Sequence, residues 1–493
     1  MQRRTFIKAG CAASLATMLP RWTQAQAGIK DNLPADQRPN IIYMVCHDLG
    51  KHISPYGVPI DTPSFQSLSD SGILFNNAFC STPCCMPSRC SAMTGKHAHR
   101  NGNVGTNHGW QLAKEQLTIV DYLNEGGYET VHAGFQHERP NRKDNRYQKL
   151  LYKTHTDLDY FCENVVDQGI EFLEKRKSED NTQPFYLNMG FVETHSSQFL
   201  PTTNPNSWNV RYGRPETYGI DPDDEVYVPP SMPDNERTRE MFRRFQPCIR
   251  FLDHHLGRFM ETVDRLGYNN NTVICFVTDH GYFGARHKST IYEGGMEITA
   301  MMRWDNHIAP GANLDGLVSN IDFTPTLLEI AGVPVPADVD GKSFLPVLLG
   351  EQTETQEAIF TQRNHHGNYD PVRSIRTKDF HYIRNFHPLA KHLYTVAETM
   401  AMSSPDRSGW PNSPIMGGAS HFELPKYENW PARAKEELYD INKDPDEQHN
   451  VADDPAYAEI KAKMAVMLEE EMIRTEDPVL EDPYALDDLS KRA

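Results

Sequence analysis

The sequence predicts an α/β protein with a large, doubly wound mixed sheet flanked by helices, followed by a smaller C-terminal α+β domain. Two apolar runs, Asn40–Cys46 and Thr272–Thr278, have the pattern of buried parallel strands, and polar residues follow both of them. Helical patterns alternate with strands up to about residue 355, where short strand-like runs take over. We therefore expect a large domain over residues 39–354 and a smaller one over 355–493, with a functional site at the carboxyl ends of the strands.

The remaining elements follow from residue spacing and from helix-end signals. Asp61-Thr62-Pro63 combines a helix-capping side chain with a proline suited to a first turn. Apolar residues at three- and four-residue spacing predict a helix over 158–173, and a longer helical pattern over 237–266 is interrupted by Pro247. Further strands are expected at 185–192, 358–361 and 381–383, and further helices at 323–330 and about 456–475.

The first 27 residues have the pattern of an export signal. Arg3-Arg4 precede a mild apolar run, and Ala25-Gln26-Ala27 offers small residues at the cleavage positions. This order predicts a twin-arginine type signal peptide over residues 1–27, and hence a bacterial protein that is periplasmic or secreted. The alternative is a basic tail before a short helix. No stretch approaches the roughly 18 consecutive apolar residues of a transmembrane helix, so we expect no membrane span.

The charge balance excludes two classes of partner. The 493 residues include 49 Lys and Arg against 67 Asp and Glu, a formal net charge of -18. The long-range field of such a chain does not attract nucleic acid or an anionic membrane, so no nucleic-acid partner is expected. A small basic pocket for an anionic group is compatible with this charge.

Nine cysteines occur in the chain, and four of them form a cluster at 80, 84, 85 and 90. Removal of the leader leaves eight, an even number that would permit disulfides in an oxidising compartment. The cluster lacks the paired spacing of a zinc site. Pro87 suits the start of a helix that Thr94-Gly95 ends, so Cys85 is expected at a helix N-terminus with Arg89 one turn later. From the residues alone, two interpretations stay open: a reactive thiol near an oxyanion, or a helix with incidental cysteines.

The segment Cys85-x-Pro87-Ser88-Arg89, with Thr94-Gly95, resembles the signature of type I, formylglycine-dependent sulfatases of the alkaline phosphatase superfamily. Companion segments follow in the family's order over about residues 39–475. They are His47-Asp48-Leu49-Gly50, Gly134-Phe135-Gln136-His137, Glu193-Thr194-His195, Asp279-His280-Gly281 with Lys288, and the closing motif Glu437-Leu438-Tyr439-Asp440 with Asp444-Pro445 and Asn450. The resemblance implies an alkaline phosphatase-like fold, with the sulfatase domain over 39–354 and substrate-recognition loops in the C-terminal subdomain.

The resemblance also implies a nucleophile and a metal. A formylglycine-generating enzyme would convert Cys85 to formylglycine, whose hydrated aldehyde attacks sulfur and later expels sulfate. The cation that the family implies is calcium (Ca2+). Its ligands here would be Asp48, Asp279, His280 and the modified Cys85, with His47 beside them.

Further roles carry over to basic residues of the same segments. Arg89 and Lys288 would bind the charge that develops on the sulfuryl oxygens. His137 would assist the modified residue, as the base in the elimination of sulfate. His195 or Lys288 would protonate the leaving group.

Two positions depart from the family's pattern. The first metal-binding turn begins with His47 where many relatives carry aspartate, and imidazole is a softer ligand than carboxylate. Either calcium loses one carboxylate or the preferred metal changes. Phe135 stands where a lysine is expected, which removes one cation from the site unless Lys96 or Arg100 fills the space. Two other histidines, His97 and His99, are expected in a surface loop.

Two segments of the smaller domain, 362–366 and 372–376, are rich in groups that recognise sugar hydroxyls and acids. His365, His366 and Arg373 are the candidate substrate contacts. These segments are similar to the heparan N-sulfatase (sulfamidase) branch, which implies a sulfated glycan or its fragments as substrate, with N-sulfate and O-sulfate both open. Two alternatives remain: a phosphodiesterase or phosphonate monoester hydrolase of the same superfamily, and a non-catalytic protein that binds sulfated glycans.

Overall fold

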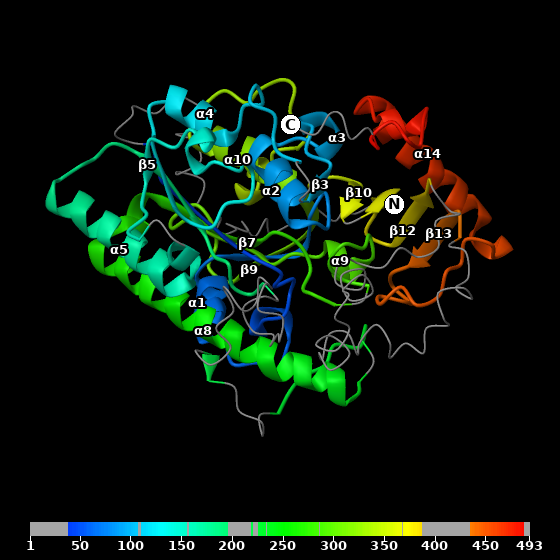
Figure 1. Cartoon of the computed structure of the whole chain (residues 1–493), viewed down its shortest axis with the longest axis horizontal. Coiled ribbons are helices and arrows are strands. Elements are labelled where there is room, and N and C mark those ends of the chain that lie inside the picture. The colour runs from blue at the N-terminus through cyan, green and yellow to red at the C-terminus, as the bar shows by residue number, and fades with distance from the viewer. Residues whose placement is uncertain are drawn as a thin grey trace, which may run out of the picture.

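The computed structural model describes residues 38–106, 110–154, 157–195, 218–219, 225–232, 234–284, 286–366, 368–386 and 434–487. The signal peptide predicted over residues 1–27 lies outside these ranges. Within them the chain forms two sheets with helices packed around them (Figure 1). The predicted α/β class, with a second and smaller sheet toward the C-terminus, is confirmed.

The larger sheet has eight strands in the order β5-β4-β6-β1-β7-β8-β2-β9. β1 lies near its centre, between β6 and β7, and runs parallel to both. β8 is antiparallel to β7 and to β2, which makes the sheet mixed, as predicted. The strands are β1 (Asn40–Cys46), β2 (Ile73–Phe79), β4 (Glu129–Gly134), β5 (Lys149–Leu150), β6 (Phe185–Gly190), β7 (Thr272–Thr278), β8 (Ala300–Arg303) and β9 (Ala312–Ser319).

Helices cover both faces of this sheet, and each face has its own core. Along β1, Ile41 and Tyr43 belong to one core, whereas Ile42 and Met44 belong to the other. Burial on both faces explains why the strand is apolar throughout rather than alternating. The helices of the first core are α2 (Cys85–Thr94), α4 (Ile119–Glu125), α10 (Phe323–Ile330) and α11 (Leu345–Leu348), and those of the second are α1 (Pro63–Ser71), α5 (Cys162–Ser178) and α8 (Glu236–Leu266) (Figure 1).

The helix α8 is continuous over 31 residues although Pro247 lies inside it. The interruption predicted at this proline is therefore wrong. Proline removes one backbone hydrogen bond and crowds the preceding turn, but Phe245, Cys248 and Ile249 on either side of it are buried in the second core. This packing, together with contacts to α1 and α5, holds the helix through the proline.

The second sheet has five strands in the order β13-β12-β11-β10-β3. Four of them come from the C-terminal part of the chain, and the helix α14 (Ala458–Arg474) packs on them. The fifth, β3 (Gly105–Thr106), comes from the N-terminal part and pairs in parallel with β10. The predicted division at residue 354 falls between α11 and β10 and stays a prediction, because this sheet includes strands from both sides of it. The four are β10 (Ile359–His366), β11 (Asn368–Arg376), β12 (Phe380–Asn385) and β13 (Glu436–Asp440).

Two further short helices are α3 (Ala98–Asn101) and α9 (Glu293–Met296). The eight cysteines of the described residues are all buried and unpaired, so the disulfides that the even count permitted do not form there. Within the described part of the chain, no helix is long and apolar enough to cross a membrane.

Candidate active site

Neighbouring strands of the larger sheet deliver polar side chains to one edge. Cys46 at the end of β1 pairs with Thr278 at the end of β7, so the residues that follow, His47-Asp48 and Asp279-His280, come side by side. β6 lies on the other side of β1. The loop after β6 is tied to the same place, because Thr194 donates to the His47 carbonyl oxygen from its backbone N–H (2.7 Å) and from its hydroxyl (3.0 Å). Parallel strand order thus gathers segments that are far apart in the sequence.

Two carboxylates and two imidazoles meet at these strand ends. One ligand atom from each of His47, Asp48, Asp279 and His280 lies within 4.8 Å of the others, and all four residues are buried. His47 Nδ1 is 2.7 Å from Asp48 Oδ1 and 3.3 Å from Asp279 Oδ2. His280 Nε2 is 3.3 Å from Asp48 Oδ1 and 3.6 Å from Asp279 Oδ1. The structure therefore brings together four of the five residues that the resemblance implied as metal ligands.

The charges around these carboxylates outweigh the effect of burial. Burial alone would raise the pKa of both aspartates, but Lys288 and His195 hold the pKa of Asp48 well below its usual value. His280 and His47 likewise lower the pKa of Asp279. Burial would lower the pKa of His47, but the two carboxylates raise it to about 9. Both carboxylates are therefore ionised, and each is in contact with a cationic side chain, Asp48 with Lys288 and Asp279 with Arg89.

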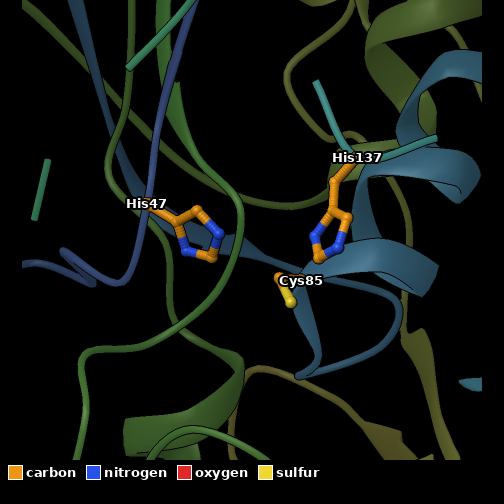
Figure 2. Close-up of side chains that lie close together, drawn as sticks. All are labelled: His47, Cys85 and His137. Atoms are coloured by element: carbon orange, nitrogen blue, oxygen red, sulfur yellow. The ribbon is translucent and has the colours of Figure 1, made fainter. Parts of the chain in front are cut away.

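Cys85 begins α2, and its thiol lies beside two imidazoles. The Cys85 Sγ atom is 4.0 Å from the hydroxyl oxygen of Thr106. Ligand atoms of Cys85, His47 and His137 lie within 4.8 Å of one another, and the two rings flank the thiol (Figure 2). Burial alone would raise the pKa of the thiol, but His137, His280 and His47 hold it well below its usual range. His47 thus belongs both to the group around the Cys85 thiol and to the carboxylate group.

Arg89 and Phe135 form a second layer around these residues. Arg89 Nε donates to Asp279 Oδ2 at 3.1 Å, and its Nη2 donates to the carbonyl oxygen of Cys46 at 3.4 Å. The guanidinium carbon is 5.1 Å from the centroid of the Phe135 ring. The same ring centroid is 5.3 Å from that of His47 and 5.4 Å from that of His137. Where a lysine was expected, the chain therefore has an aromatic surface that three site residues share.

Neither Lys96 nor Arg100 takes the place of that lysine. Lys96 pairs with Asp338, and Arg100 Nη1 is 2.5 Å from Asp340 Oδ1. The surface loop expected for His97 and His99 is also wrong, since their side chains are 3% and 1% exposed. The C-terminal end of α14 packs over this segment.

Lys288 and His195 both lie at Asp48. Lys288 Nζ donates to the two carboxylate oxygens of Asp48, each at 2.8 Å. His195 Nε2 is 4.0 Å from Asp48 Oδ2, and its ring centroid is 4.6 Å from that of His47. Burial and the charge of Lys288 hold the pKa of His195 well below its usual value. Because the His195 side chain is 26% exposed and that of Lys288 only 8%, His195 forms the more open side of the site.

The three substrate-contact candidates separate in the structure. His366 lies at the site, because its Nδ1 is hydrogen-bonded to the hydroxyl of Ser289, next to Lys288. Burial lowers the pKa of His366 to about 3. His365 faces the other way, as successive residues of a strand do, and its ring centroid is 5.1 Å from that of Trp110.

Arg373 is fully buried, and its guanidinium binds the Asp477 carboxylate and two backbone carbonyl oxygens. The substrate contact predicted for Arg373 does not fit this burial, and the prediction is corrected to a structural role. A strand pattern in the sequence shows which residues alternate, but it does not show which face meets the site.

No sequence pattern pointed to Asn320, which fixes the segment on both sides of Cys85. Its side-chain nitrogen donates to the hydroxyl of Ser88 at 2.9 Å, and its side-chain oxygen accepts from the backbone N–H of Ser81, also at 2.9 Å. Ser88 in turn donates to the carbonyl oxygen of Asp279. Ser88 belongs to the signature segment, whereas Asn320 lies 232 residues further along the chain. No sequence pattern pointed to Thr106 either.

Comparisons with protein families agree with this arrangement. Residues 39–333 match the family model described as Sulfatase, and residues 278–398 match the model described as N-sulphoglucosamine sulphohydrolase, C-terminal. An ulvan-active sulfatase of Formosa agariphila is 28% identical over 478 residues, which cover 92% of this chain and 85% of the relative. The N-sulphoglucosamine sulphohydrolase of Homo sapiens is 25% identical over 481 residues, which cover 89% of this chain and 91% of the relative.

Solved structures show the same fold. BT4656, solved in complex with its substrate D-glucosamine-2-N,6-O-disulfate, superposes with a TM-score of 0.65 at 20% identity, covering 89% of this chain and 98% of that one. BT1596, a 2-O GAG sulfatase, superposes with a TM-score of 0.61 at 19% identity, covering 90% of this chain and 94% of that one. At this level of identity, the likeness concerns the fold alone.

Proposed function

The chain belongs to the sulfatase family, and we propose that it removes sulfate groups from a sulfated carbohydrate at Cys85. The position of Cys85 carries this proposal. It begins a helix, where free backbone N–H groups favour negative charge, and it lies between His47 and His137. Next to it, Asp48 and Asp279 form an ionised pair, with Lys288 at the first carboxylate and Arg89 at the second. A nucleophile, an anion site and a carboxylate pair in one place suit hydrolysis of an anionic ester.

We infer that a formylglycine-generating enzyme matures Cys85 before the enzyme acts. The hydrated formylglycine would supply the hydroxyl group that attacks sulfur. His137 is placed to move a proton at residue 85, because its Nδ1 is buried and has no hydrogen-bond partner within the described residues. His47, on the other side of residue 85, would orient the nucleophile.

The sulfuryl oxygens would be bound by Arg89 and Lys288. Arg89 Nη1 is buried and has no hydrogen-bond partner in the described part of the chain, so it has a donor left for an anion. Lys288 contributes a second cation at Asp48. Fixed cations in a buried site stabilise charge that develops in the transition state. His195 and Lys288 are the two candidates for protonating the leaving group, with His195 on the more exposed side.

We propose that His47, Asp48, Asp279 and His280 hold a divalent cation beside residue 85. The fit rests on four buried donors within 4.8 Å of one another. A cation bound there would polarise an oxygen of the sulfate group and favour ionisation of a nearby hydroxyl. Calcium is the cation that the resemblance to type I sulfatases implies.

The substrate class follows from the relatives. We propose a sulfated glycan or a fragment of one, because one relative is described as ulvan-active and another as N-sulphoglucosamine sulphohydrolase. The second name belongs also to the family model that matches residues 278–398, which favours the heparan N-sulfatase branch. His366, at the site, is the remaining substrate-contact candidate from the smaller sheet. The experiment below therefore compares N-sulfated with O-sulfated sugars as substrates.

Sulfate release tests the proposal directly. The chain is coexpressed with a formylglycine-generating enzyme, conversion of Cys85 is followed by peptide mass spectrometry, and released sulfate is measured by ion chromatography. The substrates are glucosamine N-sulfate, glucosamine 6-O-sulfate and ulvan oligosaccharides. We expect release from at least one of them, and a loss of about 10³-fold or more in Cys85→Ala. Cys84→Ala, which changes the neighbouring buried thiol, is the matched control and should retain release.

Two outcomes would contradict the proposal. Complete conversion of Cys85 without sulfate release from any glycan would favour the non-catalytic glycan-binding protein. Faster hydrolysis of an aryl phosphate diester than of an aryl sulfate would favour the phosphodiesterase of the same superfamily.

We also propose export through a twin-arginine type signal to the periplasm or medium. Two observations support it: the Arg3-Arg4 leader, and the eight thiols of the described residues, all unpaired, which suit a protein that folds in a reducing compartment before transport. Cell fractionation tests it. Recovery of the chain only from the cytoplasm, with residues 1–27 still attached, would contradict export.

A further inference from the structure

The donors at the strand ends differ from those that calcium prefers. Calcium takes six to eight oxygen ligands at about 2.3–2.6 Å. Here, two of the four grouped side chains are imidazoles, His47 and His280. The carboxylate oxygens are also shared with other cations, since Lys288 binds both oxygens of Asp48 and Arg89 binds one oxygen of Asp279. The side chains of this group therefore offer few free oxygens and two nitrogen donors.

The hydrogen bonds of His280 show which of its nitrogens would bind a metal. His280 Nδ1 is 2.8 Å from the carbonyl oxygen of Gly281, which can only accept, so Nδ1 carries a proton. His280 Nε2 is buried and has no hydrogen-bond partner within the described residues. Its lone pair faces Asp48 Oδ1 at 3.3 Å and Asp279 Oδ1 at 3.6 Å. A lone pair that faces carboxylate oxygens is repelled by them unless a cation lies between, and a backbone carbonyl that fixes the other nitrogen is typical of metal-bound histidine.

The spacing of the donors fits a bound cation, but it does not separate the two classes of metal, because six ligands at about 2.3–2.6 Å around calcium also lie about 3.3–3.7 Å apart. Metal–ligand distances of about 2.0–2.2 Å in a tetrahedral site give ligand–ligand separations of about 3.4 Å. The separations here are 3.3 Å from His47 Nδ1 to Asp279 Oδ2, and 3.3 and 3.6 Å from His280 Nε2 to the two aspartates, whereas His47 Nδ1 is hydrogen-bonded to Asp48 Oδ1 at 2.7 Å. Imidazole with carboxylate is a donor set of zinc, manganese, iron and cobalt rather than of calcium.

We propose that this cation site selects a first-row transition-metal dication, with zinc bound more tightly than cobalt or manganese, over calcium. The proposal rests on the cation site of the proposed function. It assigns the change of metal to His47 and His280, which bring nitrogen to positions that oxygen ligands would hold in a calcium site. The expected order of affinity is Zn2+, then Co2+, then Mn2+, with Ca2+ last.

Competition between metal ions for binding to the metal-free chain tests this order of affinities. The full-length Cys85→Ala variant is used, so that neither a thiolate nor formylglycine contributes to binding. Co2+ is the probe, because nitrogen ligation in a site of low symmetry gives it visible absorption. We expect a Co2+ spectrum that a 100-fold excess of Ca2+ leaves unchanged and that one equivalent of Zn2+ abolishes. The metal that the chain retains after gel filtration is measured by mass spectrometry, which gives the number of metal ions bound per chain independently of the spectrum.

A second pair of variants in the same background tests the two histidines. His47→Asp with His280→Asn replaces both nitrogens with oxygens, and we expect Zn2+ affinity to fall by about 100-fold or more while Ca2+ begins to raise the thermal unfolding midpoint. His254→Asn, which changes an exposed histidine on α8, is the matched control and should bind metals like the parent chain. Circular dichroism of the metal-free variants checks that they fold. If the double variant does not fold, the competition in the parent chain still decides the order.

Displacement of Co2+ by stoichiometric Ca2+ would overturn the proposal, and so would unchanged Zn2+ affinity in a folded double variant. Sulfate release by the converted wild-type chain is measured separately. A chain that binds calcium and releases sulfate contradicts only the metal assignment. A chain that binds zinc but releases no sulfate contradicts only the proposed function.

Discussion

Phe135 gives the site an aromatic surface at a position where a cation was expected. Its ring lies 5.1 Å from the guanidinium carbon of Arg89 and within about 5.5 Å of the rings of His47 and His137, centroid to centroid. A guanidinium over an aromatic face is held electrostatically, and the attraction grows when water is excluded. Phe135 is 8% exposed, so this contact is largely dry. The ring therefore positions Arg89 without adding a charge to the site.

Replacement of the ring by an aliphatic side chain tests this role. In Phe135→Leu we expect the free energy of unfolding to fall by about 1–2 kcal/mol, from the lost cation–π contact and the lost buried area. The kcat for sulfate release should fall several-fold because Arg89 is less well oriented. Phe135→Tyr retains the aromatic face and is the control. Urea unfolding and steady-state kinetics give the two readouts, and equal effects of the two substitutions would contradict a role for the ring face.

Residue types in ordered segments predicted from the sequence that the proposed nucleophile, Cys85, and its neighbours belong to one site, and the structure brings these residues close together. His47, Asp48, Asp279 and His280 all follow apolar strands, and parallel pairing then brings them together. Asn320 contacts the segment around Cys85 although it is far from it in the sequence, and no comparable motif surrounds it. Its two hydrogen bonds to the segment around Cys85 depend on the packing of α2 against the turn before α10.

At the scale of elements, β10 shows what a strand pattern leaves undecided. Its last two residues are both histidines, and the structure sends His366 to Ser289 at the site and His365 to Trp110 away from it. The alternation itself follows from strand geometry. The choice of face is set by the pairing of β10 with β3. This pairing places His366 opposite Thr106, whose hydroxyl is next to the Cys85 thiol. A two-residue strand such as β3 is too short to be found from sequence.

The continuity of a helix depends on packing in a similar way. The pattern predicted over 237–266 is α8 at Glu236–Leu266, and the helix predicted over 158–173 is α5 at Cys162–Ser178. α8 continues through Pro247, because the residues around the proline are fully buried against other helices. The propensity of a single residue is a small term compared with the burial of several large side chains.

At the scale of the whole molecule, α14 connects the second sheet with the segment that follows α2. Its core residues pack on the second sheet, while its C-terminal end reaches His97 and His99, which follow α2. Glu471 lies 3.6 Å from His97, and the Thr475 carbonyl oxygen is 3.0 Å from His99. Asp477, just after the helix, binds the buried Arg373. The sequence predicted both the larger sheet and this helix, but the connection between them requires contacts between residues more than 370 positions apart.

The carboxylates of this connection make the stability of the molecule dependent on acid pH. Burial alone would raise the pKa of Asp477 above its ordinary 3.8, but Arg373 holds it at about 2. Burial would also raise the pKa of Glu471 above 4.5, whereas Arg474 and His97 hold it at about 2. Both values in the folded chain lie below those of the unfolded chain. Their contribution is therefore present above about pH 4.5 and is lost as the pH falls toward 2.

Substitution of one carboxylate isolates this effect. Between about pH 5 and pH 2.5, the ionised Asp477 should account for about 1.5 kcal/mol of the decrease in the free energy of unfolding. In Asp477→Asn the side chain no longer titrates, so the variant should be less stable than the parent chain at pH 5 and lose less stability on acidification. Glu470→Gln, which changes an exposed carboxylate on α14, is the control. Urea unfolding at the two pH values measures the difference. A decrease of equal size in Asp477→Asn and in the parent chain would show that the Arg373–Asp477 pair does not set the acid limit, and that carboxylates elsewhere in the molecule do.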